Sequence, residues 1–367
     1  MEITPQRILV IKLSSLGDIV HTLPAVSALR QRFPHSRLTW LVKDVWASIL
    51  EGNPDIDEVM PVNVSWRNWR DLIRTLRRKQ FDLVVDFQGL FRSGILGVIT
   101  GAKTRVGFAC AREGATWFYT HHVPLPDDKL STWRLLEIHA VDRNLAITEF
   151  LGERSSTPVF HLPQLSADRL AIETMLQGAE VKDHEQLIAL APWTRSAIKS
   201  WPSKRFLDLA TELIQWPNVR VVLLGGPTDT SSAEEFDILA PQGLINLVGR
   251  PSLRQLPLFL QRMQLFIGND SALLHLAAGV GTPVLAIFGP THPKATGPYP
   301  LKNHTVLRTD LPCSPCGSRK CRNPNYLECL QTISVDNLLR EVEKIVRGFS
   351  TRMGNISFSE HHSRIES

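Results

Sequence analysis

Residues 266–291 read FIGNDSALLHLAAGVGTPVLAIFGPT, and the order of apolar and polar residues in this stretch decides the fold class. An apolar run ends at Gly268 and is followed by a polar turn, a helix-forming stretch at 272–278 and a second apolar run at 284–288. This order predicts a strand, a turn, a helix and a parallel strand. Because the first turn of a helix presents unpaired backbone N–H groups, the polar turn is a candidate phosphate site.

The side chains of this turn fit an anionic ligand. Asp270, Ser271 and Ala272 lie at the expected helix start, and His275 follows on the same helical face, one turn deeper. An ordinary helix N-cap by Asp270 or Ser271 explains the first two residues equally well. His275 and the glycine-containing turn at Gly289 favour the phosphate interpretation.

A second turn, at the N-terminus, has different chemistry. The apolar run at 8–11 leads into KLSSLGD at 12–18, and apolar residues then recur at helical spacing up to residue 33. The turn lacks the glycines of a dinucleotide-binding loop, which argues against a nicotinamide-dependent oxidoreductase. Asp18 is instead a candidate general base. The alternatives are that Asp18 caps its helix and that His21 lies on a solvated face.

The two halves of the chain repeat one alternation of strands and helices. Strands are predicted at 8–12, 38–42, 58–61, 83–86 and 105–107, and again at 187–191, 219–224, 244–247, 265–268 and 284–288. This pattern predicts two doubly wound α/β domains that face a central cleft, at 1–160 and 161–347. Long helices are expected at 133–151 and 334–347, a linker at 152–164 and a disordered tail at 348–367.

Length and charge restrict the class of protein further. A chain of 367 residues with a net charge of +5 suits two globular domains. It contains no apolar run of about 18 residues and no pattern of a signal peptide at its start, so we expect a cytoplasmic protein without a transmembrane span. The balanced charge and the lack of a known nucleic-acid-binding module argue against a nucleic-acid partner.

Basic residues are concentrated in one segment, at 67–79, which contains Arg67, Arg70, Arg74, Arg77, Arg78 and Lys79. The segment is either a solvated helix face or a docking surface for an anionic acceptor or an anionic membrane. A second basic loop, APWTRSAIKSWP at 191–202, leaves a predicted strand at the expected cleft edge. Its Thr194, Arg195 and Lys199 suit a phosphate group, although an ordinary surface loop is the alternative.

Four of the five cysteines lie close together in sequence. Cys313, Cys316, Cys321 and Cys329 have the spacing C-x2-C-x4-C-x7-C, which fits no standard zinc ribbon. A structural zinc ion or iron–sulfur cluster is one interpretation. Free thiols in a packed loop and a redox-labile hairpin are the others, because disulfides are disfavoured in a reducing cytoplasm.

Four motifs together resemble a known family: KLSSLGDIVHTLPA from Lys12, DFQGLFRS from Asp86, the 194–199 loop and GNDSALLHLAAGVGTPVLAIFGPTHP from Gly268. They are similar to the ADP-heptose:lipopolysaccharide heptosyltransferases of glycosyltransferase family 9, over nearly the whole chain to about residue 347. The resemblance implies a GT-B fold of two Rossmann-like domains. It also implies an ADP-heptose donor and an inverting transfer that needs no metal ion.

The resemblance also assigns residues. Asp18 matches the family's proposed catalytic base, and Lys199, Asp270, Ser271 and His275 match its donor-binding positions. Thr194 and Ala272, in the same two turns, are expected to bind the donor as well. Acceptor contacts are expected from Ser15, Gly17, His21, Gln88, Arg92, Arg67 and Arg70. Many members have Thr-Gly where this chain has Ser271 and Ala272, so its backbone is expected to approach the phosphates less closely.

The N-terminal motif favours the family members that add the first heptose to Kdo on lipid A. The arginine-rich segment would then bind Kdo carboxylates and lipid A phosphates, with the enzyme peripheral at the cytoplasmic face of the inner membrane. Three alternatives stay open on the sequence. They are a family member with another acceptor or nucleotide-sugar, a non-catalytic sugar-nucleotide-binding protein, and a metal-dependent enzyme centred on the four cysteines.

Overall fold

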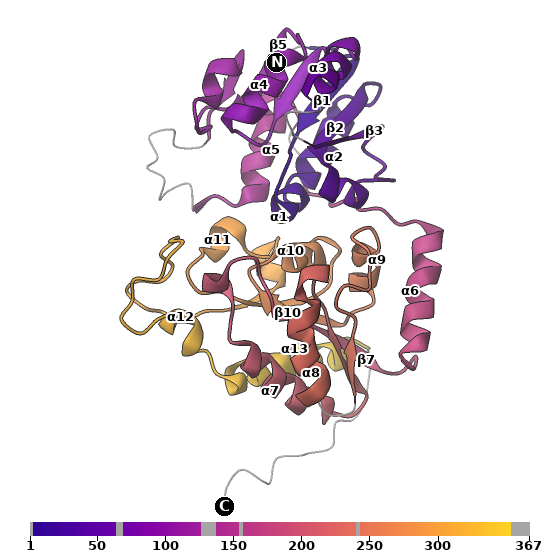
Figure 1. Cartoon of the computed structure of the whole chain (residues 1–367), viewed down its shortest axis with the longest axis vertical. Coiled ribbons are helices and arrows are strands. Elements are labelled where there is room, and N and C mark those ends of the chain that lie inside the picture. The colour runs from indigo at the N-terminus through magenta and orange to yellow at the C-terminus, as the bar shows by residue number, and fades with distance from the viewer. Residues whose placement is uncertain (1–2, 64–68, 126–136, 154–156, 240–242, 354–367) are drawn as a thin grey trace, which may run out of the picture.

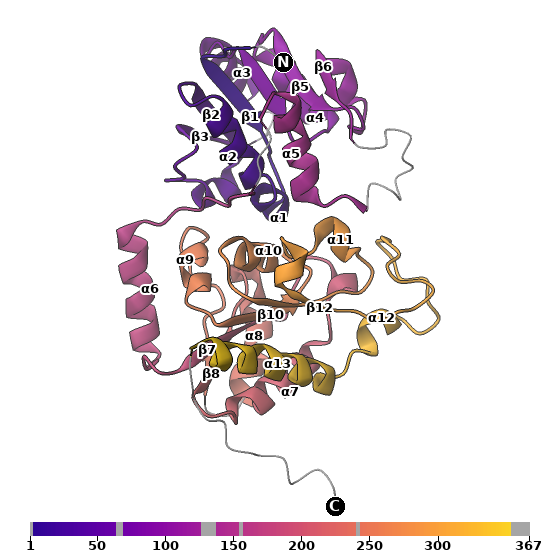
Figure 2. The same cartoon turned by 180° about the vertical axis from the view of Figure 1, so that it is seen from behind.

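The chain folds into two domains, each built on a parallel sheet. The structure is a computed structural model, and it describes residues 3–63, 69–125, 137–153, 157–239 and 243–353. Figures 1 and 2 show the N-terminal domain stacked on the C-terminal domain, with the ends of α1 and α10 at the junction. No helix in these ranges has the length and apolar composition that crossing a bilayer requires.

The N-terminal sheet has the strand order β3-β2-β1-β4-β5-β6. Its strands are β1 (Arg7–Ile11), β2 (Arg37–Lys43), β3 (Glu58–Val62), β4 (Leu83–Asp86), β5 (Thr104–Phe108) and β6 (His121–Val123). The central β1 is apolar because helices cover both faces of the sheet, and its residues 8–11 are fully buried. The strand order reverses between β1 and β4, where ligands bind in open α/β sheets.

The C-terminal sheet repeats this topology, with the order β12-β11-β10-β7-β8-β9. Its strands are β7 (Gln186–Ala191), β8 (Val219–Leu223), β9 (Leu244–Asn246), β10 (Leu265–Asn269), β11 (Val284–Ile287) and β12 (Thr305–Leu307). The order reverses between β7 and β10, so the second domain has an equivalent ligand-binding edge. The two Rossmann-like domains confirm the predicted GT-B architecture.

Helices connect the strands on both faces of each sheet. The main N-terminal helices are α1 (Leu16–Val20), α2 (Leu23–Arg32), α3 (Trp69–Arg78), α4 (Phe91–Ile99) and α5 (Ala140–Phe150). The main C-terminal helices are α6 (Ser166–Gly178), α7 (Ser203–Ile214), α8 (Thr230–Leu239), α9 (Leu256–Gln261), α10 (Ala272–Gly279) and α13 (Val335–Met353). One apolar core cluster continues across the junction, since it contains Leu16 and Val20 of α1 and Leu274 and Ala278 of α10.

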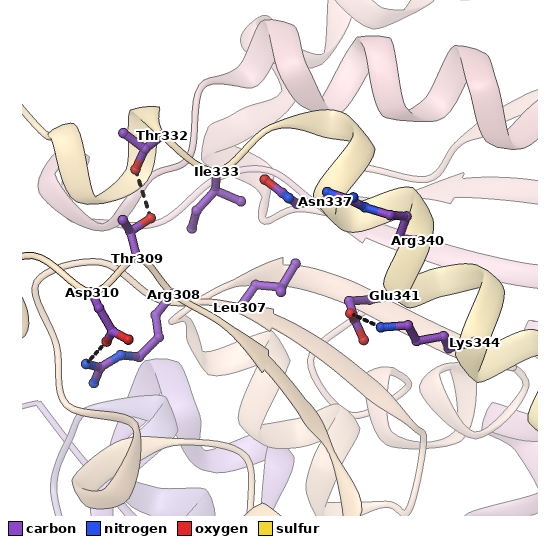
Figure 3. Close-up of a pocket in the computed structure, with 10 residues that line it drawn as sticks. All are labelled: Leu307, Arg308, Thr309, Asp310, Thr332, Ile333, Asn337, Arg340, Glu341 and Lys344. Atoms are coloured by element: carbon purple, nitrogen blue, oxygen red, sulfur yellow. Dashed lines mark hydrogen bonds and ion pairs between the residues drawn. The ribbon is translucent and has the colours of Figure 1, made fainter. Parts of the chain in front are cut away.

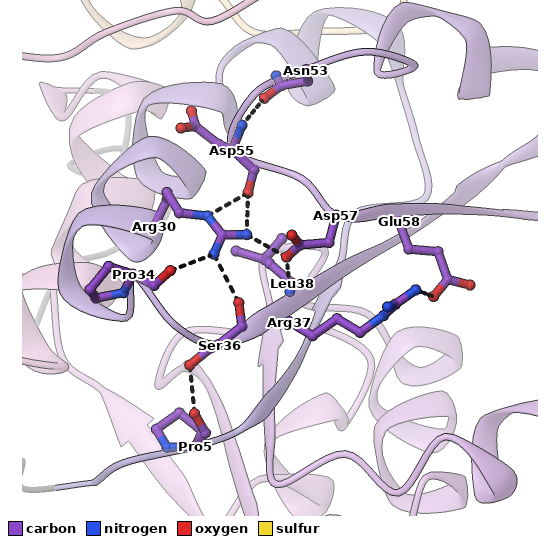
Figure 4. Close-up of polar contacts among 10 residues, drawn as sticks. All are labelled: Pro5, Arg30, Pro34, Ser36, Arg37, Leu38, Asn53, Asp55, Asp57 and Glu58. Atoms are coloured by element: carbon purple, nitrogen blue, oxygen red, sulfur yellow. Dashed lines mark hydrogen bonds and ion pairs between the residues drawn. The ribbon is translucent and has the colours of Figure 1, made fainter.

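Polar contacts fix the C-terminal end of α2 against the edge of the N-terminal sheet (Figure 4). The Arg30 guanidinium donates to the carbonyl oxygens of Asp55, at 3.0 and 3.1 Å, and of Ser36, at 2.8 Å. It also pairs with the Asp57 carboxylate, which in turn accepts a hydrogen bond from the backbone N–H of Leu38 in β2. These contacts set the position of α2, and therefore of the α1 turn that precedes it.

Several expected boundaries differ from the structure. The helix expected at 133–151 begins at Ala140, because His139 accepts a hydrogen bond from the Val141 N–H and caps it; residues 133–136 lie outside the described ranges. The last helix runs to Met353, past the expected end at residue 347, and 354–367 are not described. The sequence does not predict the short strands β6 and β12, each of which lies at an outer edge of its sheet.

Candidate active site between the domains

The two signature turns meet where α1 contacts α10. Gly17 lies against His275, and a Cβ atom at position 17 would lie 2.8 Å from the His275 Cδ2 atom. A larger residue at position 17 would therefore require a shift of the His275 ring or of one helix. Next to it, the rings of His21 and His275 pack with their centroids 4.3 Å apart. The predicted base and the predicted phosphate site thus come together across the domain boundary.

Asp18 lies in the first turn of α1, beside its N-cap residue Ser15. The Asp18 Oδ2 atom accepts hydrogen bonds from the Ser15 backbone N–H, at 3.0 Å, and from the Ser15 hydroxyl, at 2.7 Å. Burial raises the pKa of Asp18, but Lys12, the Ser15 hydrogen bonds and His275 outweigh it and the pKa is lowered. The side chain still has contact with solvent. Asp18 is therefore an ionised, accessible carboxylate, as a proton acceptor must be.

Buried groups hold the Asp18 turn in place. The Lys12 ammonium donates to the Phe87 carbonyl oxygen at 2.9 Å. The Gln88 Oε1 atom accepts from the backbone N–H groups of Leu13, at 3.0 Å, and Ser14, at 3.1 Å. The predicted acceptor residue Gln88 is therefore engaged, through this oxygen, in shaping the turn that carries Asp18.

Asp86 organises the neighbouring turn after β4. Its fully buried carboxylate accepts hydrogen bonds from the Ser93 hydroxyl and the Tyr119 hydroxyl, both at 2.7 Å, and from the backbone N–H of Gln88 at 2.8 Å. Burial raises the pKa of Asp86 despite these bonds. This network gives Asp86 a structural role, because it ties the end of β4 to α4 through Ser93 and to Tyr119.

The predicted donor-binding residues form an ion-paired cluster on the C-terminal domain. The Lys199 Nζ atom lies 2.6 Å from Asp270 Oδ2, and His275 Nε2 lies 3.5 Å from Asp270 Oδ1. Burial raises the pKa of Asp270, but His275 and Lys199 outweigh it and bring the pKa to about 2. Asp270 therefore remains ionised and fixes the positions of a cation and an imidazole.

Asn269, fully buried at the end of β10, joins this cluster to the loop that carries Lys199. Its Oδ1 atom accepts from the Trp201 backbone N–H at 2.9 Å, and its amide donates to the Pro192 carbonyl oxygen at 2.6 Å. Within the same loop, the Thr194 hydroxyl donates to the Ser196 carbonyl oxygen at 2.7 Å. Asn269 and Thr194 thus shape the loop, and Lys199 extends from it.

Four buried polar atoms at the start of α10 and after β11 have no hydrogen-bond partner in the described part of the chain. They are Ser271 Oγ, His275 Nδ1, Thr291 Oγ1 and His292 Nδ1. Buried polar groups are almost always paired, so unpaired ones need an explanation. Their position beside a helix N-terminus and Lys199 fits an anionic ligand that supplies the missing partners.

Contacts between the domains involve residues that the sequence did not single out. The His139 Nε2 atom donates to the Gly297 carbonyl oxygen at 3.0 Å, since its Nδ1 atom already accepts from Val141. The Tyr299 hydroxyl donates to Asp142 Oδ1 at 2.8 Å. Arg143, one position further along α5, has a pKa lowered by burial, with Asp18 opposing the shift. No local signal marks such residues, because only the packing of the domains brings them to the cleft.

The remaining predicted acceptor residues lie on the N-terminal domain. Arg70 of α3 and Arg92 of α4 are exposed. Arg67 lies outside the described residues. Exposed guanidinium groups can reach an anionic acceptor.

A family comparison identifies the class of protein. The sequence profile described as glycosyltransferase family 9 (heptosyltransferase) matches residues 69–327, which is more than half of the chain. The chain belongs to glycosyltransferase family 9. As a heptosyltransferase of this family it is an enzyme, a glycosyltransferase that transfers heptose in lipopolysaccharide core biosynthesis.

Individual relatives agree with this assignment. Lipopolysaccharide heptosyltransferase 1 of Pseudomonas aeruginosa is 28% identical over 333 residues, which cover 86% of this chain and 87% of the relative. The core heptosyltransferase OpsX of Haemophilus influenzae is 25% identical, with coverage of 80% and 82%. The solved structure of a family 9 glycosyltransferase from Veillonella parvula, at 24% identity, superposes with a TM-score of 0.79 and covers 94% of this chain and 97% of its own.

The cysteine loop of this heptosyltransferase does not support a metal site. Among the described residues, no group of three or more His, Cys, Asp or Glu side chains is placed to hold a metal ion. Cys313 is exposed and Cys329 is buried, with its sulfur 3.1 Å from the point where a Cβ of Gly289 would be. Burial raises the pKa of Cys329, and the thiols of Cys316, Cys321 and Cys313 raise it further. The expected structural zinc ion or iron–sulfur cluster is not supported by the described residues.

One cavity lies away from the interdomain site of the heptosyltransferase (Figure 3). Its volume is about 470 Å³, and it lies between the residues that follow β12 and the first turns of α13. Its charged lining groups are largely paired, Arg308 with Asp310 and Lys344 with Glu341. None of the predicted site residues lines it, so it has no part in the chemistry derived from the cleft.

Proposed function

We propose that this chain transfers heptose from ADP-heptose to the Kdo or inner-core region of lipopolysaccharide, with inversion at the anomeric carbon. The N-terminal domain (1–160) binds the acceptor and the C-terminal domain (161–347) binds the nucleotide-sugar. One observation carries the proposal: the Asp18 carboxylate on one domain faces the Lys199–Asp270–His275 cluster on the other. A base and an anion site on opposite sides of one cleft are what a direct displacement requires.

The reaction proceeds in one displacement. Asp18 accepts the proton of an acceptor hydroxyl while that oxygen forms a bond to the anomeric carbon. The bond from this carbon to the β-phosphate oxygen breaks on the opposite face, and ADP leaves with the electron pair. Inversion follows because the new bond forms opposite the leaving group.

Charge on the departing ADP is stabilised by the C-terminal domain. Lys199 supplies a positive charge, and the N-terminus of α10 supplies backbone N–H groups. Ser271 and Thr291 offer hydroxyls without partners of their own, since their buried oxygen atoms are unpaired among the described residues. Because these groups supply positive charge at the diphosphate, the proposed step requires no metal ion.

The acceptor side of the proposal rests on basic residues and on the relatives. Ser15, Gly17 and His21 lie at the cleft, and the exposed Arg70 and Arg92 are suited to carboxylates and phosphates. Relatives named heptosyltransferase 1 and OpsX support an inner-core acceptor, although a relative named heptosyltransferase 3 in Escherichia coli is also 25% identical. An acceptor anchored in the membrane places the enzyme peripherally at the cytoplasmic face of the inner membrane.

ADP release from ADP-heptose by the purified protein tests the proposal, with and without a Kdo-bearing lipid A acceptor. We expect release that depends on the acceptor and on Asp18. Binding of ADP-heptose without release would indicate a different acceptor or a non-catalytic binding protein, and a panel of inner-core acceptors separates the two. If ADP-heptose does not bind while another nucleotide-sugar does, the donor assignment is wrong.

A further inference from the structure

We propose that the outer surface of α4 and of the short helix η3 (Ala115–Phe118) docks onto an anionic lipid bilayer by inserting apolar side chains into its interface. This inference rests on the proposed function, in which the acceptor is a membrane glycolipid. It extends that function by assigning the lipid contact to a surface outside the cleft.

Three large apolar side chains are exposed on this surface. Phe91 and Val98 of α4 are 43% and 44% exposed, and their spacing of one heptad places them on the same helical face. Trp117 of η3 is 82% exposed. Exposed apolar residues usually occur singly, so such a group marks an interaction site. Tryptophan in particular favours the bilayer interface, where its ring is buried and its N–H remains hydrated.

Aromatic packing makes the two helices one continuous surface. The ring of Phe118 packs edge-on against Phe91, with the centroids 5.2 Å apart. The same ring lies over Gly94 of α4, where an added Cβ would come within 2.5 Å of it. Gly94 therefore lets η3 lie directly on α4, and Trp117 is held beside the exposed α4 face.

Basic side chains surround the apolar group. Arg92 and Arg112 are exposed next to it. The neighbouring α3 packs beside α4 on the same face of the sheet, and exposes Arg70, Arg74, Arg77 and Arg78. The acidic groups nearby are Glu113 and Asp71, and Asp71 is paired with Arg74. An apolar centre with a cationic rim is complementary to a bilayer that contains anionic lipids.

The surface borders the acceptor side of the active site. The Arg112 backbone N–H donates to the Gly89 carbonyl oxygen at 2.9 Å, which ties the segment before η3 to the turn after β4. Arg112 also lies within electrostatic reach of Lys12, at the base of the catalytic turn. A glycolipid whose acyl chains remain in the bilayer can therefore present its sugar to the cleft while this surface rests on the lipid.

Vesicle sedimentation tests the proposal with the full chain, on phosphatidylcholine vesicles with and without phosphatidylglycerol. The double variant Trp117→Ser, Val98→Ser removes two exposed apolar groups; the matched control, Leu170→Ser with Ile238→Ser, removes side chains that are 70% and 79% exposed on the C-terminal domain. We expect the first variant to bind anionic vesicles roughly tenfold more weakly and the control to bind like wild type. Trp117→Phe, which keeps an aromatic ring, should retain most of the binding.

Transfer activity separates this proposal from the proposed function. With a vesicle-embedded acceptor the Trp117→Ser, Val98→Ser variant should show a raised KM, whereas with an acyl-free acceptor its kcat should match wild type. The docking surface would be overturned if this variant sedimented with anionic vesicles as wild type does. It would also be overturned if the wild-type enzyme bound vesicles equally well with and without phosphatidylglycerol. If sedimentation depends on Trp117 but wild type transfers heptose to neither acceptor, the docking surface stands and the proposed function fails.

Discussion

Asp18 accepts hydrogen bonds only through Oδ2 among the described contacts, which leaves Oδ1 for the acceptor hydroxyl. Asp18→Asn keeps the shape of the side chain but removes its proton affinity. We therefore expect kcat to fall by a factor on the order of 10² or more, with ADP-heptose affinity nearly unchanged. Steady-state kinetics and donor titration measure both quantities. The exposed Asp208→Asn is the control, and an unaltered kcat in Asp18→Asn would remove this residue from the role of base.

The Lys199 ammonium group forms an ion pair with the Asp270 carboxylate, within the proposed diphosphate site. Lys199→Ala removes one charge-assisted hydrogen bond to the diphosphate, so ADP should bind about tenfold to hundredfold more weakly. Calorimetric titration with ADP measures the loss. Lys204→Ala, on the exposed side of α7, removes the same charge elsewhere. Equal ADP affinity in the two variants would contradict the phosphate assignment.

Asn269 makes two buried hydrogen bonds that no other residue replaces. Asn269→Ala leaves the Trp201 N–H and the Pro192 carbonyl without partners. The free energy of unfolding should fall by roughly 2–4 kcal/mol, because each unpaired buried group costs about 1–3 kcal/mol. Urea denaturation measures the change, with the exposed Asn303→Ala as control. A loss below about 1 kcal/mol would show that the loop finds other partners.

At the scale of elements, the contact between α1 and α10 sets the distance between base and donor site. Gly17→Ala places a methyl group 2.8 Å from His275 Cδ2, which is closer than carbon atoms approach. The His275 ring or one of the helices must shift, so we expect kcat to fall about tenfold or more while ADP affinity is retained. Gly178→Ala, where an added Cβ meets nothing within 4 Å, is the control. Normal turnover in Gly17→Ala would mean that the enzyme tolerates this shift.

At the scale of the whole molecule, buried histidines at the domain junction make the folded state sensitive to acid. Burial lowers the pKa of His139 to about 4 from its ordinary 6.5, and burial also lowers that of His21. Below pH 6.5 the unfolded chain binds protons that the folded chain excludes. Stability is therefore full above that pH and is lost as the pH falls toward 4, by about 2 kcal/mol at pH 5 for His139 alone.

Thermal denaturation between pH 7.5 and 5 measures this effect. His139→Asn can still cap α5 but cannot titrate, so its unfolding free energy should decline less steeply over this range than that of wild type. Identical slopes for the two proteins would mean that His139 does not contribute to the acid sensitivity.

The sequence was sufficient for most of the fold. Continuous apolar runs such as 8–11 and 265–267 mark strands buried on both faces, and the polar turns that follow them mark the carboxyl edges where ligands bind. This local information predicts five of the six strands of each sheet. It also predicts that Asp18 and the Asp270 turn lie at the same cleft. The sequence does not predict β6 and β12. These segments are strands because each pairs with a neighbouring strand, and their own residue pattern does not indicate it.

By itself, then, the sequence determined the α/β class and the family, and it predicted the two turns proposed to hold the base and the donor, since these depend on residue order within single elements. Only the tertiary structure decided which residues join the domains. His139 and Tyr299 carry no local motif, and Gly17 proved to be a point of contact with His275. The four cysteines show the same limit: their closeness in sequence suggested a metal site, but the described residues contain no group placed to hold a metal ion, and Cys329 is buried in the core. Spacing along the chain does not fix distances between elements, and those distances decide contact.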